Sequence, residues 1–365
     1  MKNKRLLFII NGLGLGNSTR CSAIIHELYT SGYRIDVVSS ANGLSYFSNS
    51  AEVEGLFSFQ SLLYGKANGK LSILKTLLTL PKLSLLFFKN CIYLQSLLKK
   101  TKYAAIVFDS DYSVASLFWR RDRPLLIATN NAGIIVEECK NLTELPRKIR
   151  MQYWVEKLDD WFHNIVPDIV ICPVFKKNDK SLHSRIKYTS PIIRSGLDIK
   201  PAGQNLENIL IMLSGSQFGS DIDFIKKLPD LPNISIKVIG KLGESNNAVS
   251  FFGKVYDNRS LINAADVLVI NAGFSAISEA IVLKKPAVVM AIENHAEQYI
   301  NSLLFEQHGL GLLATQENAH EKITQMLTDF EKYKKAHGQF DAPADGSISA
   351  AAFIHEAIES RKVGK

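Results

Sequence analysis

One run of small and polar residues, 271–280, has the composition of a phosphate-binding turn. It reads Asn-Ala-Gly-Phe-Ser-Ala-Ile-Ser-Glu-Ala and follows the apolar stretch 267–270. The backbone N–H groups at the start of a helix attract anions, so a helix that begins near Ser275 would hold a diphosphate. Glu279 lies four residues later, about one helical turn away, and its carboxylate can accept hydrogen bonds from the two hydroxyls of a ribose. Taken alone, Glu279 is also explained as a helix-surface or capping acid.

A second polar cluster follows the next apolar stretch, 286–290. It reads Glu-Asn-His-Ala-Glu-Gln-Tyr-Ile-Asn at 293–301. Acid, amide and imidazole groups directly after the carboxyl end of a strand suit the hydroxyls of a sugar. We expect His295 to contact a donor sugar or its phosphates rather than to act as a base. The two clusters in this order predict a site for a nucleotide-activated sugar.

Two further turns resemble the first in composition and are less specific. Residues 12–20 read Gly-Leu-Gly-Leu-Gly-Asn-Ser-Thr-Arg, and their glycines let a ligand or another backbone approach closely. The GxGxG spacing lacks the third glycine of a dinucleotide-binding fingerprint, and Ser39 and Ser40 stand where its ribose-binding acid is expected. A tight strand-to-helix turn is the alternative for 12–20. The turn 214–219 is of a kind that many α/β proteins have.

Two carboxylates at the end of another apolar stretch are candidates for a general base. Asp109 and Asp111 flank Ser110, and paired carboxylates raise each other's affinity for a proton. Helix N-capping by one of them is the alternative. This run matches a metal-binding DxD motif by its letters, but it lies in the first half of the chain, away from 271–301. We therefore expect no metal to bind at this run, and we interpret His163 as structural.

The apolar stretches alternate with helical patterns in two successive series. Short apolar strands that alternate with helices predict parallel sheets with right-handed crossovers. The chain is therefore expected to be an α/β protein with two doubly wound halves, and ligands are expected at the carboxyl ends of the strands, in a cleft between the halves. The first helix is expected at 18–31. The strands are expected at 6–11, 34–40, 104–109, 125–129 and 169–172, and then at 209–213, 234–239, 267–270 and 287–290.

Length and composition agree with two domains. The chain has 365 residues, of which 46% are hydrophobic and 21% charged, enough to bury two cores. The net charge of +8 favours an anionic partner such as a nucleotide diphosphate or anionic lipid, and the lack of a recognisable binding module disfavours nucleic acid.

Four scattered cysteines without CxxC spacing fit a reduced cytoplasmic setting and do not suggest zinc. The apolar run 6–10 is too short for a signal peptide, and no apolar run reaches the roughly 18 residues of a membrane span.

The block 271–311 resembles the C-terminal signature of GT-B glycosyltransferases, both the plant-type UDP-glycosyltransferases and MurG, the lipid-linked N-acetylglucosamine transferase. Less specific similarities lie elsewhere: 214–217 is similar to the Gly-Gly-Ser-Gln turn of the MurG type, 191–194 to its Asn-Pro-Val-Arg segment, and 130–134 to its Gln-Asn-Gly-Ile loop. The turn 12–20 is similar to the N-terminal glycine loop of related transferases. The shared frame of the C-terminal block is small-Gly-aromatic-Ser, then Glu279, Pro286, Glu297-Gln298, Asn301 and Gly309-Leu310-Gly311.

The resemblance implies a GT-B fold, in which two Rossmann-like domains face a central cleft, and an inverting sugar transfer from a UDP-sugar. Because GT-B enzymes generally hold the diphosphate with helix dipoles and side chains, it also implies no obligatory metal or other cofactor. By this resemblance Glu279 would bind the ribose, Ser275 the diphosphate, Glu297 and Gln298 the donor sugar, and 255–256 the uracil. The implied glycine-loop residues on the acceptor side are Gly14, Gly16, Asn17 and Ser18. The implied donor-site residues are Arg194, Ser214, Gly215, Ser216, Gln217, Val255, Tyr256, Asn271, Gly273, Phe274, Ser275, Glu279, His295, Glu297 and Gln298.

Two positions depart from the pattern of the family. Asn271 stands where plant-type enzymes have a histidine, which alters one contact to the diphosphate. Asn17 stands where related transferases have a histidine in the glycine loop. An amide cannot take a proton at neutral pH, so a histidine-based mechanism at residue 17 is doubtful, and Asp109 or Asp111 becomes the expected base.

The segment 70–100 bears on the acceptor. It is rich in Leu, Ile and Phe, with interspersed lysines and with Pro81 interrupting it. A basic amphipathic segment of this kind can lie on a membrane that holds a lipid-linked acceptor, and an ordinary pair of helices covering the sheet is the alternative. We expect a cytoplasmic enzyme, with the inner face of the membrane as the place where such an acceptor would be met.

The expected organisation has four parts. Residues 1–196 form the acceptor domain, 197–206 a linker, 207–345 the nucleotide-sugar domain, and 346–365 a helix that packs either on the first domain or locally on the second. Two other functions stay open. One is a UDP-sugar hydrolase or 2-epimerase on the same fold, and the other is a non-catalytic nucleotide-sugar-binding protein, suggested by Asn17 and Asn271.

Overall fold

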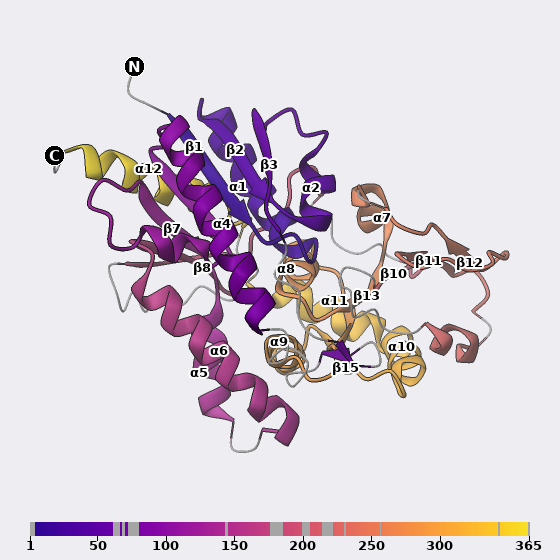
Figure 1. Ribbon diagram of the computed structural model, residues 1–365. Helices are drawn as coiled ribbons and strands as arrows, with labels where there is room; N and C mark the ends of the chain where they lie inside the picture. The colour runs from indigo at the N-terminus through magenta and orange to yellow at the C-terminus, as the bar shows by residue number, and fades with distance from the viewer. Residues whose placement is uncertain are drawn as a thin grey trace. The chain divides into compact units, whose positions relative to one another are not determined.

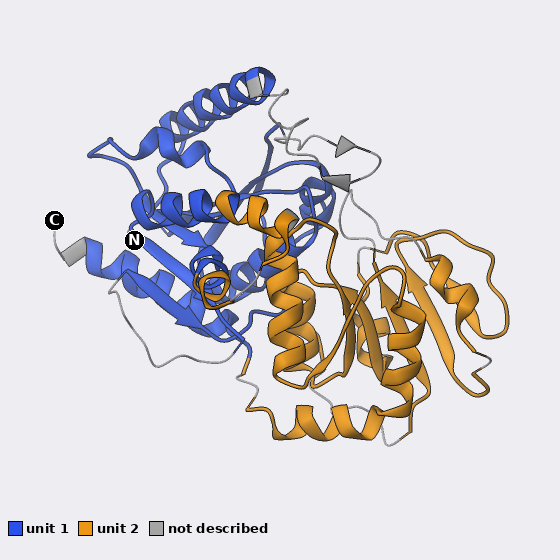
Figure 2. Ribbon diagram, turned by 90° about the horizontal axis from the view of Figure 1, so that it is seen from below, with its two compact units in different colours: residues 1–136, 155–194, 345–365 blue, residues 137–154, 195–344 orange. Residues whose placement is uncertain are grey.

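The computed structural model describes residues 4–60, 66–67, 70–71, 80–142, 145–175, 185–198, 205–213, 222–229, 231–255, 257–341 and 344–363. The chain divides into two compact units (Figure 1, Figure 2). Unit 1 consists of Met1–Val136, Val155–Arg194 and Asp345–Lys365, and unit 2 of Glu137–Trp154 and Ser195–Ala344. The division differs from the expected one mainly at Glu137–Trp154, because the end of α5 (Ala132–Asn141) and the start of α6 (Arg147–Ile165) group with unit 2.

Unit 1 is built on a parallel sheet with the strand order β3-β2-β1-β6-β7-β8-β9. The five strands expected in this half are confirmed to within one residue at each end, because each carries an apolar run that is buried on both faces. The edge strands β3 and β9 were not expected, since polar residues interrupt their apolar runs. The strands are β1 (Arg5–Ile10), β2 (Arg34–Ser39), β3 (Gly55–Ser58), β6 (Ala105–Asp109), β7 (Leu125–Thr129), β8 (Ile169–Pro173) and β9 (Ile186–Thr189).

Helices cover both faces of this sheet. Alternate residues of a strand point to opposite faces: Leu6 and Phe8 pack in a core with α1 and α12, whereas Leu7 and Ile9 pack in a core with α4, η1 and α6. In Figure 1, α4 crosses in front of the strands of unit 1. The helices not yet bounded are α1 (Gly16–Thr30), α2 (Ala41–Phe47), α4 (Leu80–Lys100), the 3₁₀ helix η1 (Ser113–Leu117) and α12 (Ser347–Val363).

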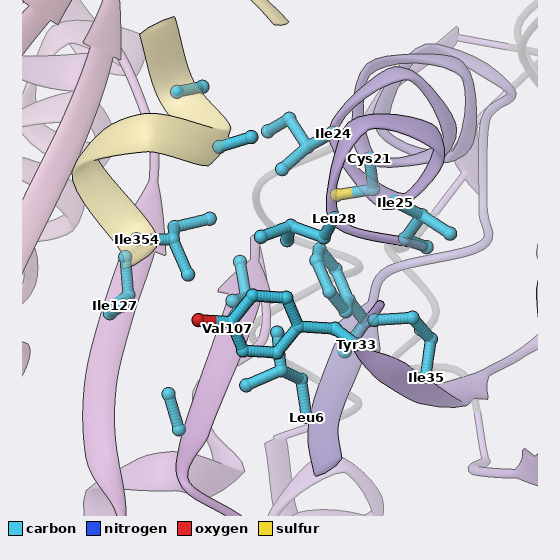
Figure 3. Close-up of a cluster of buried hydrophobic side chains, with 14 of the residues drawn as sticks. Leu6, Cys21, Ile24, Ile25, Leu28, Tyr33, Ile35, Val107, Ile127 and Ile354 are labelled. Atoms are coloured by element: carbon cyan, nitrogen blue, oxygen red, sulfur yellow. The ribbon is translucent and has the colours of Figure 1, made fainter. Parts of the chain in front are cut away.

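The C-terminal helix α12 is part of unit 1. Ile354 and Ile358 are buried in the same core as Ile24 of α1, and Figure 3 shows Ile354 facing that cluster. The Tyr33 hydroxyl lies 2.7 Å from His355 Nδ1. The last helix therefore completes the core that the first strands begin.

A hydrogen-bonded junction joins the place where the chain leaves unit 1 to the place where it returns. One Asp345 carboxylate oxygen accepts hydrogen bonds from the backbone N–H groups of Ile193, at 3.1 Å, and Ser347, at 3.0 Å. The Gly346 N–H donates to the Pro191 carbonyl at 2.9 Å. A Cβ on Gly346 would lie 2.1 Å from the carbonyl oxygen of Ser190, so this close approach requires glycine.

Unit 2 repeats the architecture with a parallel sheet in the order β12-β11-β10-β13-β14-β15. The four strands expected here are confirmed to within one residue, and β12 and β15 were not expected. The strands are β10 (Asn208–Met212), β11 (Ser235–Ile239), β12 (Val249–Phe251), β13 (Val267–Asn271), β14 (Ala287–Met290) and β15 (Gly311–Ala314). The helices are η2 (Asp223–Lys227), α7 (Arg259–Ala264), α8 (Phe274–Val282), α9 (Ala296–Gln307), α10 (Ala319–Thr328) and α11 (Phe330–Gln339).

The lysine-rich segment 70–100 is only partly helical. The short strands β4 (Lys66–Ala67) and β5 (Lys70–Leu71) pair antiparallel. Residues 72–79, where the first helix of the alternative helical pair would lie, are outside the described residues. Pro81 does not break the segment. It lies in the first turn of α4, where a backbone N–H has no acceptor in the helix. No helix in the described part of the chain is long and apolar enough to cross a bilayer.

Candidate functional site

The turn between β13 and α8 lies at the carboxyl edge of the unit 2 sheet. Strand β13 ends at Asn271, and α8 begins at Phe274 after Gly273, whose backbone is extended. A Cβ built on Gly273 meets no atom of the described residues within 4 Å. The first turn of α8 carries no acidic side chain. A helix start whose first turn has no carboxylate is suited to an anion.

Two side-chain amides fix the shape of this turn. Asn271 Nδ2 donates to the Leu213 carbonyl at 2.9 Å, which links the ends of β13 and β10. Asn301 Nδ2, from α9, donates to the Ala272 carbonyl at 3.2 Å. The sequence frame included Asn301 but assigned it no role. Asn301 lies four residues after Glu297, so on a helix the two side chains share one face. This spacing indicated that Asn301 lies near the turn.

Glu279 and Ser275 lie on α8 as the sequence predicts, one turn apart. Ser275 is half-buried near the start of the helix, and Glu279 is 4% exposed. The hydroxyl of Ser278, between them, is buried without a hydrogen-bond partner in the described structure. The roles of Ser275 and Glu279 toward a diphosphate and a ribose stay predictions.

The expected sugar-reading residues follow β14. His295 precedes α9, Glu297 lies in its first turn, and Gln298 is buried. Gln298 Oε1 accepts a hydrogen bond from the Ile292 N–H at 3.0 Å, so this oxygen shapes the loop. A role of the Gln298 amide toward a sugar stays a prediction. His295 Nδ1 is buried without a hydrogen-bond partner in this part of the structure.

Part of the expected donor site lies outside the described residues, namely Ser214, Gly215, Ser216, Gln217 and Tyr256. Val255 is described and half-buried, shortly after β12. Arg194 is half-buried and is the last residue of unit 1 before the chain enters unit 2.

The glycine loop connects β1 to α1 at the carboxyl edge of the unit 1 sheet. A Cβ on Gly12 would lie 1.7 Å from the Ser40 carbonyl oxygen, so the chain can turn here only with glycine. Gly14, Gly16 and Asn17 are half-buried, and Ser18 is buried in the first turn of α1.

Asp109 is held in a buried ion pair directly below this loop. Arg20 of α1 donates from Nε and Nη2 to its two carboxylate oxygens at 2.9 and 2.8 Å, and the Thr129 hydroxyl donates at 2.9 Å. The residue is 0% exposed. A carboxylate that is fully enclosed and paired with a guanidinium cannot reach an acceptor hydroxyl, so these contacts contradict the expectation that Asp109 is a general base. The sequence placed Arg20 in the glycine loop but did not show its partner.

Asp111 has a different environment. Its carboxylate is half-buried and accepts hydrogen bonds from the Ser113 N–H, at 2.9 Å, and from the Ser113 hydroxyl. Burial raises the pKa of Asp111 above its ordinary value, although the hydrogen bonds from Ser113 oppose the shift. Ser110, between the two aspartates, has a positive φ of 53°, a conformation that is uncommon outside glycine and is concentrated at functional turns. The Asp111 carboxylate caps η1 and has a raised proton affinity. Both expected roles, helix N-cap and general base, are therefore compatible with the geometry.

A second polar cluster lies beside these aspartates. The Asp159 carboxylate of α6 accepts hydrogen bonds from the Tyr112 hydroxyl at 2.8 Å and from Asn130 Nδ2 at 3.0 Å. His163 Nδ1 lies 3.2 Å from the same carboxylate, and its ring stacks on Phe108. Burial opposes charge on both residues, but their mutual interaction prevails. It raises the pKa of His163 and lowers that of Asp159. These contacts anchor α6 to the ends of β6 and β7, in agreement with a structural His163.

A family model supports the assignment suggested by this architecture. The model of glycosyl transferase family 1 matches residues 4–330. An uncharacterized glycosyltransferase of Methanosarcina acetivorans is 23% identical over 367 aligned positions, which cover 93% of this chain and 96% of the relative.

A second relative carries a more specific name. It is the UDP-N-acetylglucosamine–N-acetylmuramyl-(pentapeptide) pyrophosphoryl-undecaprenol N-acetylglucosamine transferase 3 of Bacillus cereus. It is 23% identical over 275 positions, which cover 67% of this chain and 71% of that protein.

Solved structures share the fold along the whole chain. The glycosyltransferase of kitacinnamycin superposes with a TM-score of 0.66 at 17% identity, covering 97% of this chain and 98% of that one. MurG of Acinetobacter baumannii superposes with a TM-score of 0.60 at 13% identity, covering 96% and 99%. Two units with parallel sheets, the matching neighbours and a family model that spans most of the sequence agree. The chain belongs to glycosyl transferase family 1 and is a glycosyltransferase with the GT-B fold.

Proposed function

We propose that this glycosyltransferase moves a sugar from a UDP-sugar to a hydroxyl acceptor with inversion at the anomeric carbon. The observation that carries the proposal is the helix start at Gly273, followed one turn later by the buried carboxylate of Glu279. The backbone N–H groups at the start of α8 would bind the diphosphate, and Glu279 would accept hydrogen bonds from the ribose hydroxyls.

The donor sugar would meet the loop between β14 and α9. Glu297 would accept hydrogen bonds from sugar hydroxyls, and the Gln298 amide would donate to them. As the glycosidic bond breaks, negative charge grows on the diphosphate, and the helix start of α8 would stabilise that charge without a proton transfer.

Asp111 is the residue we assign as general base. An attacking hydroxyl must lose a proton, and Asn17 cannot accept it. A carboxylate with a raised pKa is a stronger base. Asp109 would act as a positioning residue, because its ion pair with Arg20 connects the end of β6 to the first turns of α1.

The acceptor is proposed to be lipid-linked and met at the inner face of a membrane. Two observations support this: the name of the Bacillus cereus relative refers to an undecaprenol-linked substrate, and the lysine-rich helix α4 exposes Leu85, Phe88 and Ile92.

A thermal-shift screen over UDP-, GDP- and dTDP-sugars tests the donor site. A ligand that binds only the folded protein at about 100 times its Kd adds roughly 2.7 kcal/mol of stability. We expect UDP-sugars to raise the melting temperature of the natural chain and of Glu321→Ala, a control that removes an exposed acid from α10. The shift should be lost in Glu279→Ala and reduced in Glu279→Gln, which keeps the size of the buried side chain.

The same samples separate the alternative functions. Release of UDP in water alone, at the rate seen with an acceptor, would indicate a hydrolase. Interconversion of the UDP-sugar with its epimer at the second carbon of the sugar would indicate a 2-epimerase. Binding of a UDP-sugar without any turnover would indicate a non-catalytic protein. No shift with any nucleotide sugar would contradict the donor site.

A further inference from the structure

The turn that carries Asp111 is held on both of its sides by side chains of other segments of unit 1. Before it, the Ser110 carbonyl accepts a hydrogen bond from Asn11 Nδ2 at 3.2 Å, which links the turn to the residue after β1. After it, the Tyr112 hydroxyl donates to one oxygen of Asp159 at 2.8 Å, which links the turn to α6. Because Asp111 lies between these two attachments, both of them help to set the direction of its carboxylate.

Asp159 also holds a second turn at the same edge of the sheet. Its other carboxylate oxygen accepts a hydrogen bond at 3.0 Å from Nδ2 of Asn130, the residue that follows β7. Asn130 Oδ1 in turn accepts a hydrogen bond from the Ala132 N–H at 2.5 Å, at the start of α5. One carboxylate of α6 therefore fixes the turns after two neighbouring strands, β6 and β7, each through a different oxygen.

The two oxygens of Asp159 can serve both turns because the group is ionised. Burial opposes this charge, but the bond to His163 prevails and lowers the pKa of Asp159. An ionised carboxylate has only acceptor atoms, so it can bind a hydroxyl and an amide N–H at once. Such charged acceptors also form shorter and stronger hydrogen bonds than neutral ones. An asparagine at this position would place an NH₂ group against one of the two donors and lose that bond.

A second tyrosine–aspartate bond lies at the opposite edge of the same sheet. The hydroxyl of Tyr103, two residues before β6, donates to Asp36 of β2 at 2.6 Å. Both residues are buried, and Arg5 pairs with the same carboxylate at 2.8 Å. This bond lies where the strands begin, away from Asp111. Tyr103 therefore shows what the loss of such a bond does to stability alone.

We propose that Asp159 is a positioning residue for sugar transfer: through Tyr112 it directs the Asp111 carboxylate at the attacking hydroxyl, and through Asn130 it fixes the start of α5. This role rests on the proposed function, because Asp111 is the proposed base. In the transfer step the attacking O–H bond breaks and its proton passes to Asp111. The oxygen bonds to the anomeric carbon, and the old bond breaks with its electron pair on the diphosphate. Asp159 exchanges no proton in this step.

The release of UDP from a UDP-sugar tests this role. The substrate is the UDP-sugar that gives the largest thermal shift, with water as the acceptor and, in parallel, with a total lipid extract as the source of acceptor. A displacement of about 1 Å at a reacting group can lower a rate on the order of 100-fold. We expect Tyr112→Phe and Asp159→Asn each to lower kcat by about tenfold or more. The KM for the UDP-sugar and the UDP thermal shift should stay unchanged.

Tyr103→Phe is the matched control, because it removes the same kind of bond at the other end of β6. It should lower the melting temperature and keep the natural kcat. The exchange Asp159→Asn/Asn130→Asp again places one carboxylate and one amide in contact, with their positions reversed. It should recover part of the kcat that is lost in Asp159→Asn.

Natural kcat in Tyr112→Phe and Asp159→Asn, beside an impaired Asp111→Asn, would overturn the positioning role and leave the proposed base intact. An equal fall of kcat in Tyr103→Phe and Tyr112→Phe would overturn it as well, since the effect would then be one of stability. Natural kcat in Asp111→Asn contradicts the proposed base instead. No release of UDP by the natural chain in either assay contradicts the proposed transfer.

Discussion

Asp109 and Asp111 lie two positions apart after the same strand, and their surroundings separate their chemistry. Asp109 is enclosed by Arg20 and Thr129, whereas Asp111 is half-buried with a raised pKa. The sequence identified both carboxylates but could not rank them. The partners of Asp109 lie 89 and 20 residues away along the chain, so only the folded sheet brings them together. Spacing within a motif predicts local geometry well and long-range pairing poorly.

Substitution of the two aspartates should therefore have different consequences. Asp111→Asn removes the proposed base, and we expect kcat to fall by about 10²–10⁴-fold with little change in stability. Asp109→Asn leaves the Arg20 guanidinium buried without its counter-charge, which should cost about 3–5 kcal/mol of unfolding free energy. Steady-state kinetics and urea unfolding of both variants check this. A stable and inactive Asp109→Asn beside an active Asp111→Asn would reverse the assignment.

The central strands and the start of α8 are the elements that sequence predicts best. Each of these strands is an apolar run buried on both faces, and each ends in polar or small residues. The edge strands β3 and β9 escaped prediction because half of their surface is exposed and their residues are mixed. The exposed apolar side chains of α6, such as Leu158 and Trp161, were not predicted either. An amphipathic period shows that a helix has two sides but does not show which side meets the core.

Glycine substitutions test the start of α8 as an element. Gly273→Ala should fold normally, because its φ of −67° suits any residue and its Cβ meets no atom of the described part of the chain within 4 Å. The added methyl group would occupy the space where the diphosphate is expected, so UDP affinity should fall by about tenfold or more. The control is Gly12→Ala, whose Cβ would overlap the Ser40 carbonyl and should destabilise unit 1. Thermal unfolding with and without UDP measures both effects. An unchanged UDP shift in Gly273→Ala would exclude this turn from the donor site.

At the scale of the whole molecule, each unit buries a histidine, and the two histidines respond to acid in opposite ways. In unit 1 the charge of Asp159 overcomes burial and raises the pKa of His163. In unit 2 burial lowers the pKa of His337 from its ordinary 6.5 to about 4, although its Nε2 interacts with the Leu310 carbonyl at 2.8 Å. The two-domain organisation was predictable from the repeated series of apolar runs. These environments were not, because they depend on tertiary burial.

Acidification should weaken unit 2 selectively. Below pH 6.5 the unfolded chain takes up a proton at His337 that the folded chain refuses until about pH 4. The unfolding free energy of unit 2 should therefore fall across this window, by roughly 3 kcal/mol in total. His163 has the opposite sign: its contribution to unit 1 is present below the ordinary histidine pKa and is lost as the pH rises through its raised value.

Hydrogen exchange resolved by peptide, at about pH 7 and about pH 5, measures the two units separately. After correction for the intrinsic exchange rate, the backbone amides of β15 and α11 should be less protected at the lower pH. The protection of the β6 amides should not decrease in parallel. His337→Gln cannot take up the proton and should remove this extra decrease. An equal loss of protection in the variant would assign the acid sensitivity of unit 2 to other groups.

The junction at Asp345 has a consequence for how such proteins can be recombined. Because Ile193 and Ser347 donate to one carboxylate, the segment between them starts and finishes at nearly the same point of unit 1. Most of unit 2 is thus a long insertion with adjoining ends, which Asp345, Gly346 and Ser347 close. Grafting the corresponding segment of a relative between residues 194 and 345 would exchange most of unit 2 while leaving this junction and α12 in place.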